Sequence, residues 1–341
     1  MRVAMYYNNS DIRLEQLPLP KISQGEILIK TIASGVCGSD TMQWYRLPKA
    51  PLVLGHEIAG EVIEIAGDVK KFKTGDRVIA THHVPCNTCY HCIRGNHSAC
   101  SILRSTHFDP GGFSEFIRIP AINVDRGVLK LPDNVSYEEG SFVEPLGCVV
   151  RGQRLAGFKT GSSVLIIGCG MTGLLNLQYA KSQGAGNIFA VDINDFKLDK
   201  AKEFGADFII KADQNVSGKI KELNEGRLAD FVIVNTGAEP AIEQALSLVE
   251  LGGTILYFAP SEPEYTMSVN FNELWWKGIK IISSYAAAQN DLSLALSIIS
   301  NGRVNVKDMI THRLPLGETQ KGFEMVIKST DSIKVIIEPQ N

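Results

Sequence analysis

The sequence lacks an excess of charge of either sign, a basic N-terminal leader and a long apolar run. Its 341 residues include 34 Lys and Arg against 37 Asp and Glu, a formal net charge of −3. That balance gives no reason to expect a nucleic acid or an anionic membrane surface as partner. The N-terminal residues MRVAMYYNNSDIRL lack the pattern of a signal peptide. The most apolar stretch, 164–180, is interrupted by three glycines, Asn and Gln and is too short to span a membrane. We therefore expect a cytoplasmic protein.

Internal repeats of solenoid length and low-complexity tracts are missing too, which excludes a repeat array. A length of 341 residues suggests two domains, since one domain usually takes about 100–200 residues. Cysteine is scarce, with seven residues, yet four of them lie between positions 86 and 100. In a chain of this size without a secretion signal, such thiols are expected to bind a metal or act in catalysis rather than form disulfides.

The pattern of the chain changes near residue 148. Before it, Val- and Ile-rich runs bounded by Gly, Pro and Asp predict short strands, at 26–33, 59–66 and 76–81. After it, six apolar strands alternate with helices, a pattern typical of a parallel, doubly wound nucleotide-binding sheet. The predicted strands are 162–168, 187–193, 207–211, 230–236, 254–259 and 279–284. The first helix follows strand 162–168 and ends near residue 183, and the other helices cover 195–205, 216–224, 240–250 and 270–277.

The last part of the chain predicts a helix at 289–300 and a strand at 332–339, which should return to the first domain. The expected fold class is α/β. A β-rich catalytic domain takes residues 1–147 and 287–341, and a nucleotide-binding domain takes residues 148–286.

A glycine-rich turn follows the first strand of the predicted parallel sheet. Gly168, Gly170 and Gly173 form a GxGxxG motif that encloses Met171 and Thr172 and opens a helix. Glycines there let the backbone approach a pyrophosphate at the helix N-terminus. Asp192 ends the next strand, nineteen residues past Gly173, where a carboxylate accepts hydrogen bonds from the adenosine ribose. A 2′-phosphate would meet that carboxylate, so we expect NAD rather than NADP.

Two alternatives at this turn stay open. Lys197 is the nearest cation that could receive the 2′-phosphate of NADP. The three glycines could also form a tight turn without a ligand.

The four clustered cysteines have the spacing C-x2-C-x2-C-x7-C. Cys86, Cys89, Cys92 and Cys100 can supply four thiolates to one tetrahedral zinc, and such a filled coordination sphere makes the zinc structural. Iron–sulfur clusters also use four cysteines, but with other usual spacings. Free buried thiols are the plain alternative. His91 and His97 lie in the same segment but are surplus to four thiolates, so we expect them at the surface.

Four further motifs stand in a fixed order with the cysteines and the glycine-rich turn. They are CGSD (37–40), GHE (55–57), GDRV (75–78) and EPL (144–146). Together they resemble the zinc-containing medium-chain alcohol and polyol dehydrogenase family over nearly the whole chain. The EPL motif is similar to the sorbitol (polyol) and threonine dehydrogenase branches, because the alcohol dehydrogenase branch has a cysteine ligand there. The resemblance implies a GroES-like catalytic domain beside a Rossmann NAD-binding domain.

The resemblance also implies a second, catalytic zinc. Cys37 and His56 would be direct ligands, Glu57 a third ligand or close to it, and Glu144 a ligand directly or through a water. A mixed set of thiolate, imidazole and carboxylate with one open position suits a catalytic zinc. Cys148 would be a small core residue.

Proton transfer in the polyol branch starts at a serine, which would be Ser39 here. The branch usually has a histidine three residues later, where this chain has Met42. Methionine cannot carry a proton, so we expect the path to run through Glu57, Glu144 and water, or through the cofactor ribose.

Trp44, His107 and Phe108 fall where the family lines its substrate pocket, although Trp44 and Phe108 could be core aromatics and His107 could simply hydrogen-bond a loop. A polyhydroxylated secondary alcohol, or its ketone, is the expected substrate, and sorbitol-like polyols, sugar acids, cyclitols and sugar phosphates would all fit. A phosphate-bearing substrate would need a cation near the pocket, for which Arg46 and Lys49 are candidates. Threonine and a simple secondary alcohol remain alternative substrates.

The adjacent His82 and His83 are expected to point to opposite faces of a strand and to be structural. Two other readings of the chain stay open. It could be an inactive sensor that binds NAD and zinc, or a zinc-free NADPH-dependent reductase. The apolar segment 275–285 would end the sheet, and an exposed edge of this kind needs pairing. We therefore expect a homo-oligomer, a tetramer or a dimer.

Overall fold

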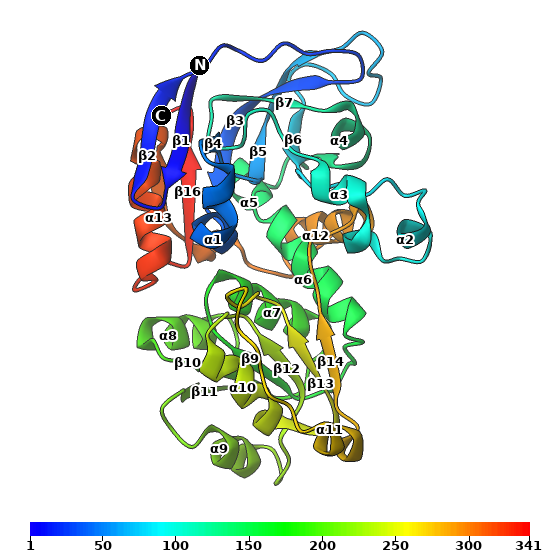
Figure 1. Cartoon of the computed structure of the whole chain (residues 1–341), viewed down its shortest axis with the longest axis vertical. Coiled ribbons are helices and arrows are strands. Elements are labelled where there is room, and N and C mark those ends of the chain that lie inside the picture. The colour runs from blue at the N-terminus through cyan, green and yellow to red at the C-terminus, as the bar shows by residue number, and fades with distance from the viewer. The chain divides into compact units, whose positions relative to one another are not determined.

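The computed structural model describes residues 1–341, which fall into two compact units (Figure 1). The first unit comprises Met1–Gly147, Ala286–Gly302 and Val306–Asn341, and the second comprises Cys148–Tyr285 and Arg303–Asn305. The boundary after Gly147 lies within one helix, α6 (Val143–Leu155). None of the helices combines the length and apolar character that crossing a membrane would require.

The second unit is built on a six-stranded sheet in which every neighbouring pair is parallel. Its order, β11-β10-β9-β12-β13-β14, is the doubly wound order that the sequence predicts. The strands are β9 (Val164–Ile167), β10 (Ile188–Asp192), β11 (Phe208–Lys211), β12 (Ala229–Val234), β13 (Val249–Tyr257) and β14 (Lys280–Ser283). The helices are α7 (Met171–Ser182), α8 (Asp195–Glu203), α9 (Val216–Leu223), α10 (Glu239–Leu248) and α11 (Phe271–Lys277).

Burial explains why these strands are apolar without alternation. Every residue of β9 and β10 is buried, because both faces of a central parallel strand are covered. The bounds agree with the expected ones to within two residues, except that β13 begins five residues early, at Val249. The sheet order reverses between β9 and β12, and ligands of doubly wound sheets bind at the carboxyl ends of the strands at that point.

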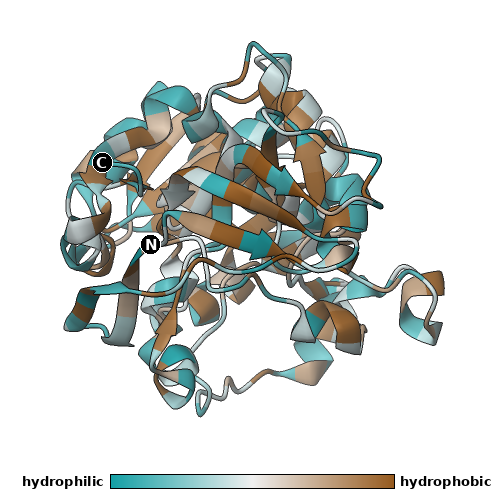
Figure 2. Cartoon of the chain, turned by 90° about the horizontal axis from the view of Figure 1, so that it is seen from above, coloured by the Kyte–Doolittle hydropathy of each residue, from teal (hydrophilic) through white to brown (hydrophobic).

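The first unit contains two sheets. A small antiparallel sheet joins β1 (Arg2–Asn8), β2 (Asp11–Gln16) and β4 (Leu52–Val53). The larger sheet has seven strands, which run β15-β16-β3-β5-β6-β8 with β7 also paired to β3. These strands are β3 (Ile27–Gly35), β5 (Glu57–Ile65), β6 (Arg77–Ala80), β7 (Phe116–Ile119), β8 (Val128–Lys130), β15 (Ile310–Pro315) and β16 (Lys334–Glu338). Figure 2 shows the apolar residues concentrated on the strands and the polar ones on the connecting loops.

Short helices connect the strands of the first unit. The α-helices are α1 (Gln43–Arg46), α2 (Tyr90–Ile93), α3 (Ser101–Ser105), α4 (Ala121–Arg126), α5 (Tyr137–Gly140), α12 (Gln289–Ser300) and α13 (Thr319–Lys328). The 3-10 helices are η1 (Gly38–Thr41), η2 (Leu47–Lys49), η3 (His97–Ala99), η4 (Lys307–Met309) and η5 (Leu316–Glu318). The C-terminal strand β16 pairs antiparallel with β3, opposite Ser34 and Gly35. That pairing brings the end of the chain beside the motif that follows β3.

Candidate metal and nucleotide sites

Cys37 stands just after strand β3 and caps the short helix η1. Its sulfur accepts hydrogen bonds from the backbone N–H of Ser39, at 3.4 Å, and from the Ser39 hydroxyl, at 3.3 Å. These two contacts fix the position of the Cys37 sulfur at the start of η1.

His56 is held against Asp40, a residue for which the sequence reasoning assigned no role. The His56 Nδ1 lies 3.2 Å from the Asp40 Oδ1, and the Asp40 side chain is fully buried. Burial lowers the pKa of His56, but the charges of Asp40 and Cys37 outweigh it and raise that pKa well above its ordinary value. Since Asp40 engages Nδ1, the other ring nitrogen remains available to a metal, and a carboxylate behind a histidine ligand fixes its orientation.

Glycine is required at the turn that delivers His56. Gly55 has a φ of +94°, in the left-handed region. A Cβ at this position would meet the Phe113 backbone nitrogen at 2.7 Å. Only glycine therefore fits between β4 and β5 here.

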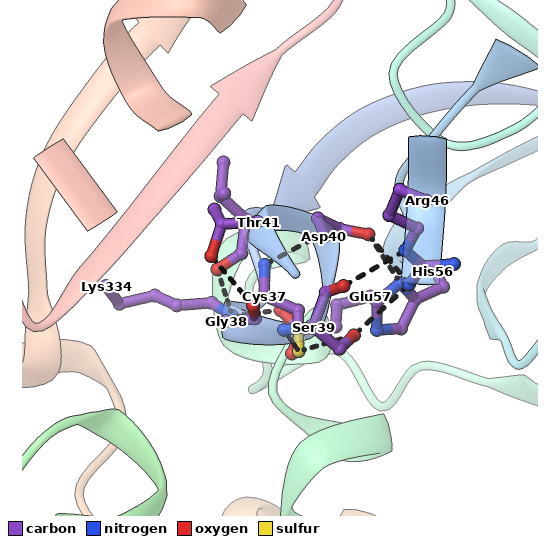
Figure 3. A network of polar contacts seen from close by, with 10 residues as sticks. Cys37, Gly38, Ser39, Asp40, Thr41, Arg46, His56, Glu57 and Lys334 are labelled. Carbon is purple, nitrogen blue, oxygen red and sulfur yellow. Dashed lines mark hydrogen bonds and ion pairs between the residues drawn. The ribbon is translucent and has the colours of Figure 1, made fainter. Parts of the chain in front are cut away.

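Glu57 begins strand β5 and forms an ion pair with Lys334 from β16 (Figure 3). Both side chains are fully buried, and the ammonium group contacts the Glu57 Oε2. The second carboxylate oxygen, Oε1, is buried without a hydrogen-bond partner. An unpartnered buried carboxylate oxygen is costly, so a cation fits beside it. No local sequence pattern indicates this pair, because its members are 277 residues apart.

Cys37, His56 and Glu57 come together as one candidate metal group. Their ligand atoms all lie within 4.8 Å of one another. Sulfur, nitrogen and oxygen donors in this combination fit a zinc ion with an open position. Glu144 is not a member of the group. It lies in the first turn of α6 and is 9% exposed.

Arg46 connects the neighbours of this group. Its Nε donates to the Ser39 carbonyl at 3.0 Å, and its Nη2 lies 3.2 Å from the Ser39 hydroxyl oxygen and 3.3 Å from the Asp40 Oδ1. Because a guanidinium cannot accept a proton, it gives the Ser39 hydroxyl no outlet of its own. On sequence alone, Arg46 is only a candidate phosphate ligand. Local spacing does not show that its guanidinium group contacts Ser39 and Asp40 in η1.

A pocket of about 260 Å³ opens beside His56. Its walls include His107 and Phe108, two of the three residues expected at the substrate, as well as Arg46 and Lys49. Trp44 does not line this pocket. It is 40% exposed, and its ring centroid lies 5.7 Å from that of Tyr45. Phe108 also packs in the hydrophobic core of the large sheet. It therefore lines the pocket and belongs to the core at the same time.

The expectation that His82 and His83 point apart is wrong. Strand β6 ends at Ala80, so strand alternation does not apply to them, and their ring centroids are only 3.6 Å apart. His82 lines the pocket, with its ring centroid 4.8 Å from that of His56. Burial lowers the pKa of His83 to about 3 and that of His82 well below its usual value, so both rings are neutral at pH 7.

The second candidate metal group consists of the four clustered cysteines, as the sequence predicts. The ligand sulfurs of Cys86, Cys89, Cys92 and Cys100 lie within 4.8 Å of one another. Tetrahedral zinc with bonds of about 2.3 Å requires sulfurs roughly 3.8 Å apart, and the sulfurs of Cys86 and Cys92 are 3.9 Å apart. Donors on Thr88 lower the pKa of Cys86 to about 5, which favours its thiolate. The group fits a structural zinc.

The glycine-rich turn lies between β9 and α7, with Gly170 as the N-cap of the helix. Gly168 has a φ of +87°, and a Cβ on Gly173 would lie 1.9 Å from the Gly168 carbonyl oxygen. A Cβ on Gly170 would meet no atom within 4 Å. Gly168 and Gly173 are therefore needed for the backbone of the turn. Gly170 leaves open space at the helix N-terminus, where a pyrophosphate fits. Met171 and Thr172 form the first positions of α7.

Asp192 ends β10 beside this turn. Its Oδ2 accepts the backbone N–H of Cys169 at 2.7 Å, and its Oδ1 accepts that of Asn194 at 2.9 Å. The following residue, Ile193, is 80% exposed. The carboxylate is thus fixed at the carboxyl edge of the sheet, where the ribose of a dinucleotide fits.

Comparisons with known proteins agree with this architecture. Residues 23–133 match the alcohol dehydrogenase GroES-like domain, and residues 172–301 match the zinc-binding dehydrogenase model. The chain is 32% identical to the L-threonine 3-dehydrogenase of Bacillus licheniformis, over 95% of this chain and 94% of the relative. It is 33% identical to the sorbitol dehydrogenase of Ovis aries, over 96% of this chain and 93% of the relative.

A solved structure extends the likeness to three dimensions. The 2R,3R-butanediol dehydrogenase from Bacillus subtilis superposes with a TM-score of 0.85 at 26% identity, over 99% of both chains. One family assignment follows from the two domain matches, the two candidate metal groups and these relatives. The chain belongs to the zinc-containing medium-chain alcohol and polyol dehydrogenase family and is an oxidoreductase.

Proposed function

We propose that this enzyme oxidises a secondary alcohol of a polyhydroxylated small molecule with NAD+, and reduces the corresponding ketone in the reverse direction. The observation that carries the proposal is the convergence of Cys37, His56 and Glu57 beside a small pocket with polar walls. In the forward direction the alcohol carbon gives a hydride to the nicotinamide, and the hydroxyl group loses one proton. The products are a ketone, NADH and a proton.

Cys37, His56 and Glu57 are the proposed ligands of a catalytic zinc, with Glu144 as a further ligand directly or through a water. A zinc ion held there supplies Lewis acidity toward the substrate oxygen. Asp40 keeps the imidazole of His56 in the orientation of a ligand. Lys334 balances part of the negative charge that Glu57 brings into the buried site.

Ser39 is the proposed first acceptor of the substrate proton. Its hydroxyl contacts the Cys37 sulfur, so it stands at the metal group. Neither Met42 nor Arg46 can carry the proton further. The outlet therefore runs through water, the carboxylates Glu57 and Glu144, or the ribose of the cofactor.

NAD is the proposed cofactor of the second unit. The open space at Gly170 and the N-terminus of α7 would receive the pyrophosphate. Asp192 would accept the ribose hydroxyls, and its charge would repel a 2′-phosphate. The four-cysteine group would hold a structural zinc that stabilises the segment around α2 and η3.

The substrate class is inferred from chemistry shared by the named substrates of the relatives. Threonine, sorbitol and 2,3-butanediol each carry a secondary hydroxyl next to a carbon with another heteroatom. Threonine remains a second candidate, because the relative named for it is about as similar as the one named for sorbitol.

We also infer a homo-oligomer that works in the cytoplasm. Edge strand β14 and helix α11 expose apolar side chains, among them Trp275 at 70% and Trp276 at 79%. Pairing of β14 with the same strand of a second copy would cover this edge. No disulfide joins any of the seven cysteines, and a reducing compartment keeps thiols in that state. Sedimentation velocity tests the oligomer, and a monomer at micromolar concentration contradicts it.

The decisive test is NAD+ reduction by zinc-loaded protein, followed by NADH absorbance, on polyols, vicinal diols and threonine. Cys37→Ala is the matched inactive control, and Cys148→Ala is the control for loss of a thiol elsewhere. The expected result is turnover of one class, lost in Cys37→Ala and kept in Cys148→Ala. Absence of turnover on every class, with two zinc ions and NAD bound, would contradict the proposal.

A further inference from the structure

The pocket beside His56 carries a positive charge without a carboxylate partner. Lys49, at the end of η2, lines the pocket and is exposed. Its Nζ lies 3.7 Å from the centroid of the Tyr45 ring, and the ammonium forms no ion pair. A cation–π contact positions an ammonium but does not neutralise it.

The second cation of the pocket is fixed and partly neutralised. The Arg46 side chain is 12% exposed and shares the Asp40 carboxylate with His56. Asp40 is the one carboxylate in the pocket lining and is fully buried. The lining therefore holds more positive than negative charge, and its unpaired cation is Lys49.

Both cations act on the pocket interior. Burial, and then the charges of Lys49 and Arg46, lower the pKa of His107, which also lines the pocket. Lys49 and Arg46 therefore both lie close enough to act on the His107 ring, and they bring positive charge to the pocket lining. Such positive charge attracts an anion and gives no advantage to an uncharged polyol.

We propose that the substrate carries an anionic group, a carboxylate or a phosphate, which Lys49 binds while the reacting hydroxyl faces Cys37 and His56. This inference rests on the proposed function and names the substrate class for the same site: a hydroxy acid or an alcohol phosphate of short carbon chain. The pocket of about 260 Å³ is smaller than the roughly 300–1,000 Å³ of drug-sized sites, which suits such a molecule.

The test compares substrates that share a six-carbon chain and differ in whether one end carries an anionic group. Steady-state kcat and KM for NAD+ reduction are measured on the six-carbon alditols, on their 1-phosphates and on the six-carbon aldonates. Wild-type enzyme is expected to favour one anionic class over the parent alditols by at least tenfold in kcat/KM. Whether the phosphates or the aldonates are preferred identifies the anion.

Substitutions connect the preference to Lys49. Lys49→Met is expected to lower the ratio of anionic to neutral kcat/KM by about 10- to 100-fold, mainly through KM, since hydrogen bonds to charged groups have that strength. Lys49→Arg should restore most of the preference. Lys70→Met removes an exposed lysine of the same unit, whose Nζ contacts only the Gly67 carbonyl, and should change nothing.

The outcomes separate the two proposals. If the alditols are turned over as well as the anions, or if Lys49→Met leaves the ratio unchanged, the anionic substrate is refuted and the dehydrogenase function stands. Failure of every alditol, aldonate, phosphate, diol and threonine refutes the proposed function itself.

Discussion

The buried ion pair between Glu57 and Lys334 leads to a quantitative prediction. Both side chains are fully buried. Lys334→Met keeps most of the aliphatic stem but leaves the Glu57 carboxylate without its counter-charge. Breaking a buried pair in this way costs about 3–5 kcal/mol. For a folded unit of about 150–250 residues each kcal/mol lowers Tm by about 2–4 °C, so we expect a fall of roughly 6–20 °C.

Calorimetric scans of wild type, Lys334→Met, Glu57→Gln and the double variant, with one control variant, test this reasoning. The double variant should recover much of the lost Tm, because no uncompensated charge remains. Its zinc content, measured by atomic absorption, should nevertheless fall toward one ion per chain, because a ligand is missing. Lys328→Met, which removes a lysine whose side chain is 72% exposed, is the control and should stay near wild type. A Tm of Lys334→Met within 1 °C of wild type, or a double variant as unstable as Lys334→Met, would refute the argument.

Three further predictions concern the metal and cofactor sites. Asp40→Asn should lower the zinc affinity of the catalytic group, or kcat/KM, by about 10- to 100-fold, because the His56 ring loses the carboxylate that orients it. Unchanged kinetics and zinc content would argue against an orienting role of Asp40. Cys100→Ser should cost one zinc ion per chain and lower the Tm, and a retained second ion by atomic absorption would contradict a four-thiolate site. Asp192→Ala combined with Ile193→Arg should move the NAD/NADP ratio of kcat/KM toward NADP by more than tenfold, and an unchanged ratio would remove the ribose role of Asp192.

The sequence predicts the second unit well because its signals are local. Strands β9 and β10 are short continuous apolar runs, and the glycine-rich turn marks the junction between β9 and helix α7. Sheet order then follows from the doubly wound pattern. The four-cysteine group is predictable for the same reason, since its ligands lie within fifteen residues.

The catalytic surroundings were harder to predict because they depend on contacts between distant segments. Lys334 reaches Glu57 only because β16 pairs with β3. Asp40 is the last residue of the CGSD motif, but the sequence spacing of that motif does not show that the Asp40 carboxylate contacts His56. The orientation expected for His82 is wrong because strand β6 ends at Ala80 and strand alternation does not extend to residue 82. In each case the position of the side chain is set by tertiary packing and not by neighbours in the sequence.

The pairing of β16 with β3 also has a consequence for folding during synthesis on the ribosome. Cys37, His56 and Glu57 have been synthesised by residue 57, and Glu144 follows, long before the counter-charge at residue 334. Until the final strand emerges, Glu57 has no lysine beside it and β3 lacks one of its neighbours. Completion of the metal site is thereby coupled to completion of the chain. A protein truncated before residue 334 would retain every proposed ligand and still lack the finished site.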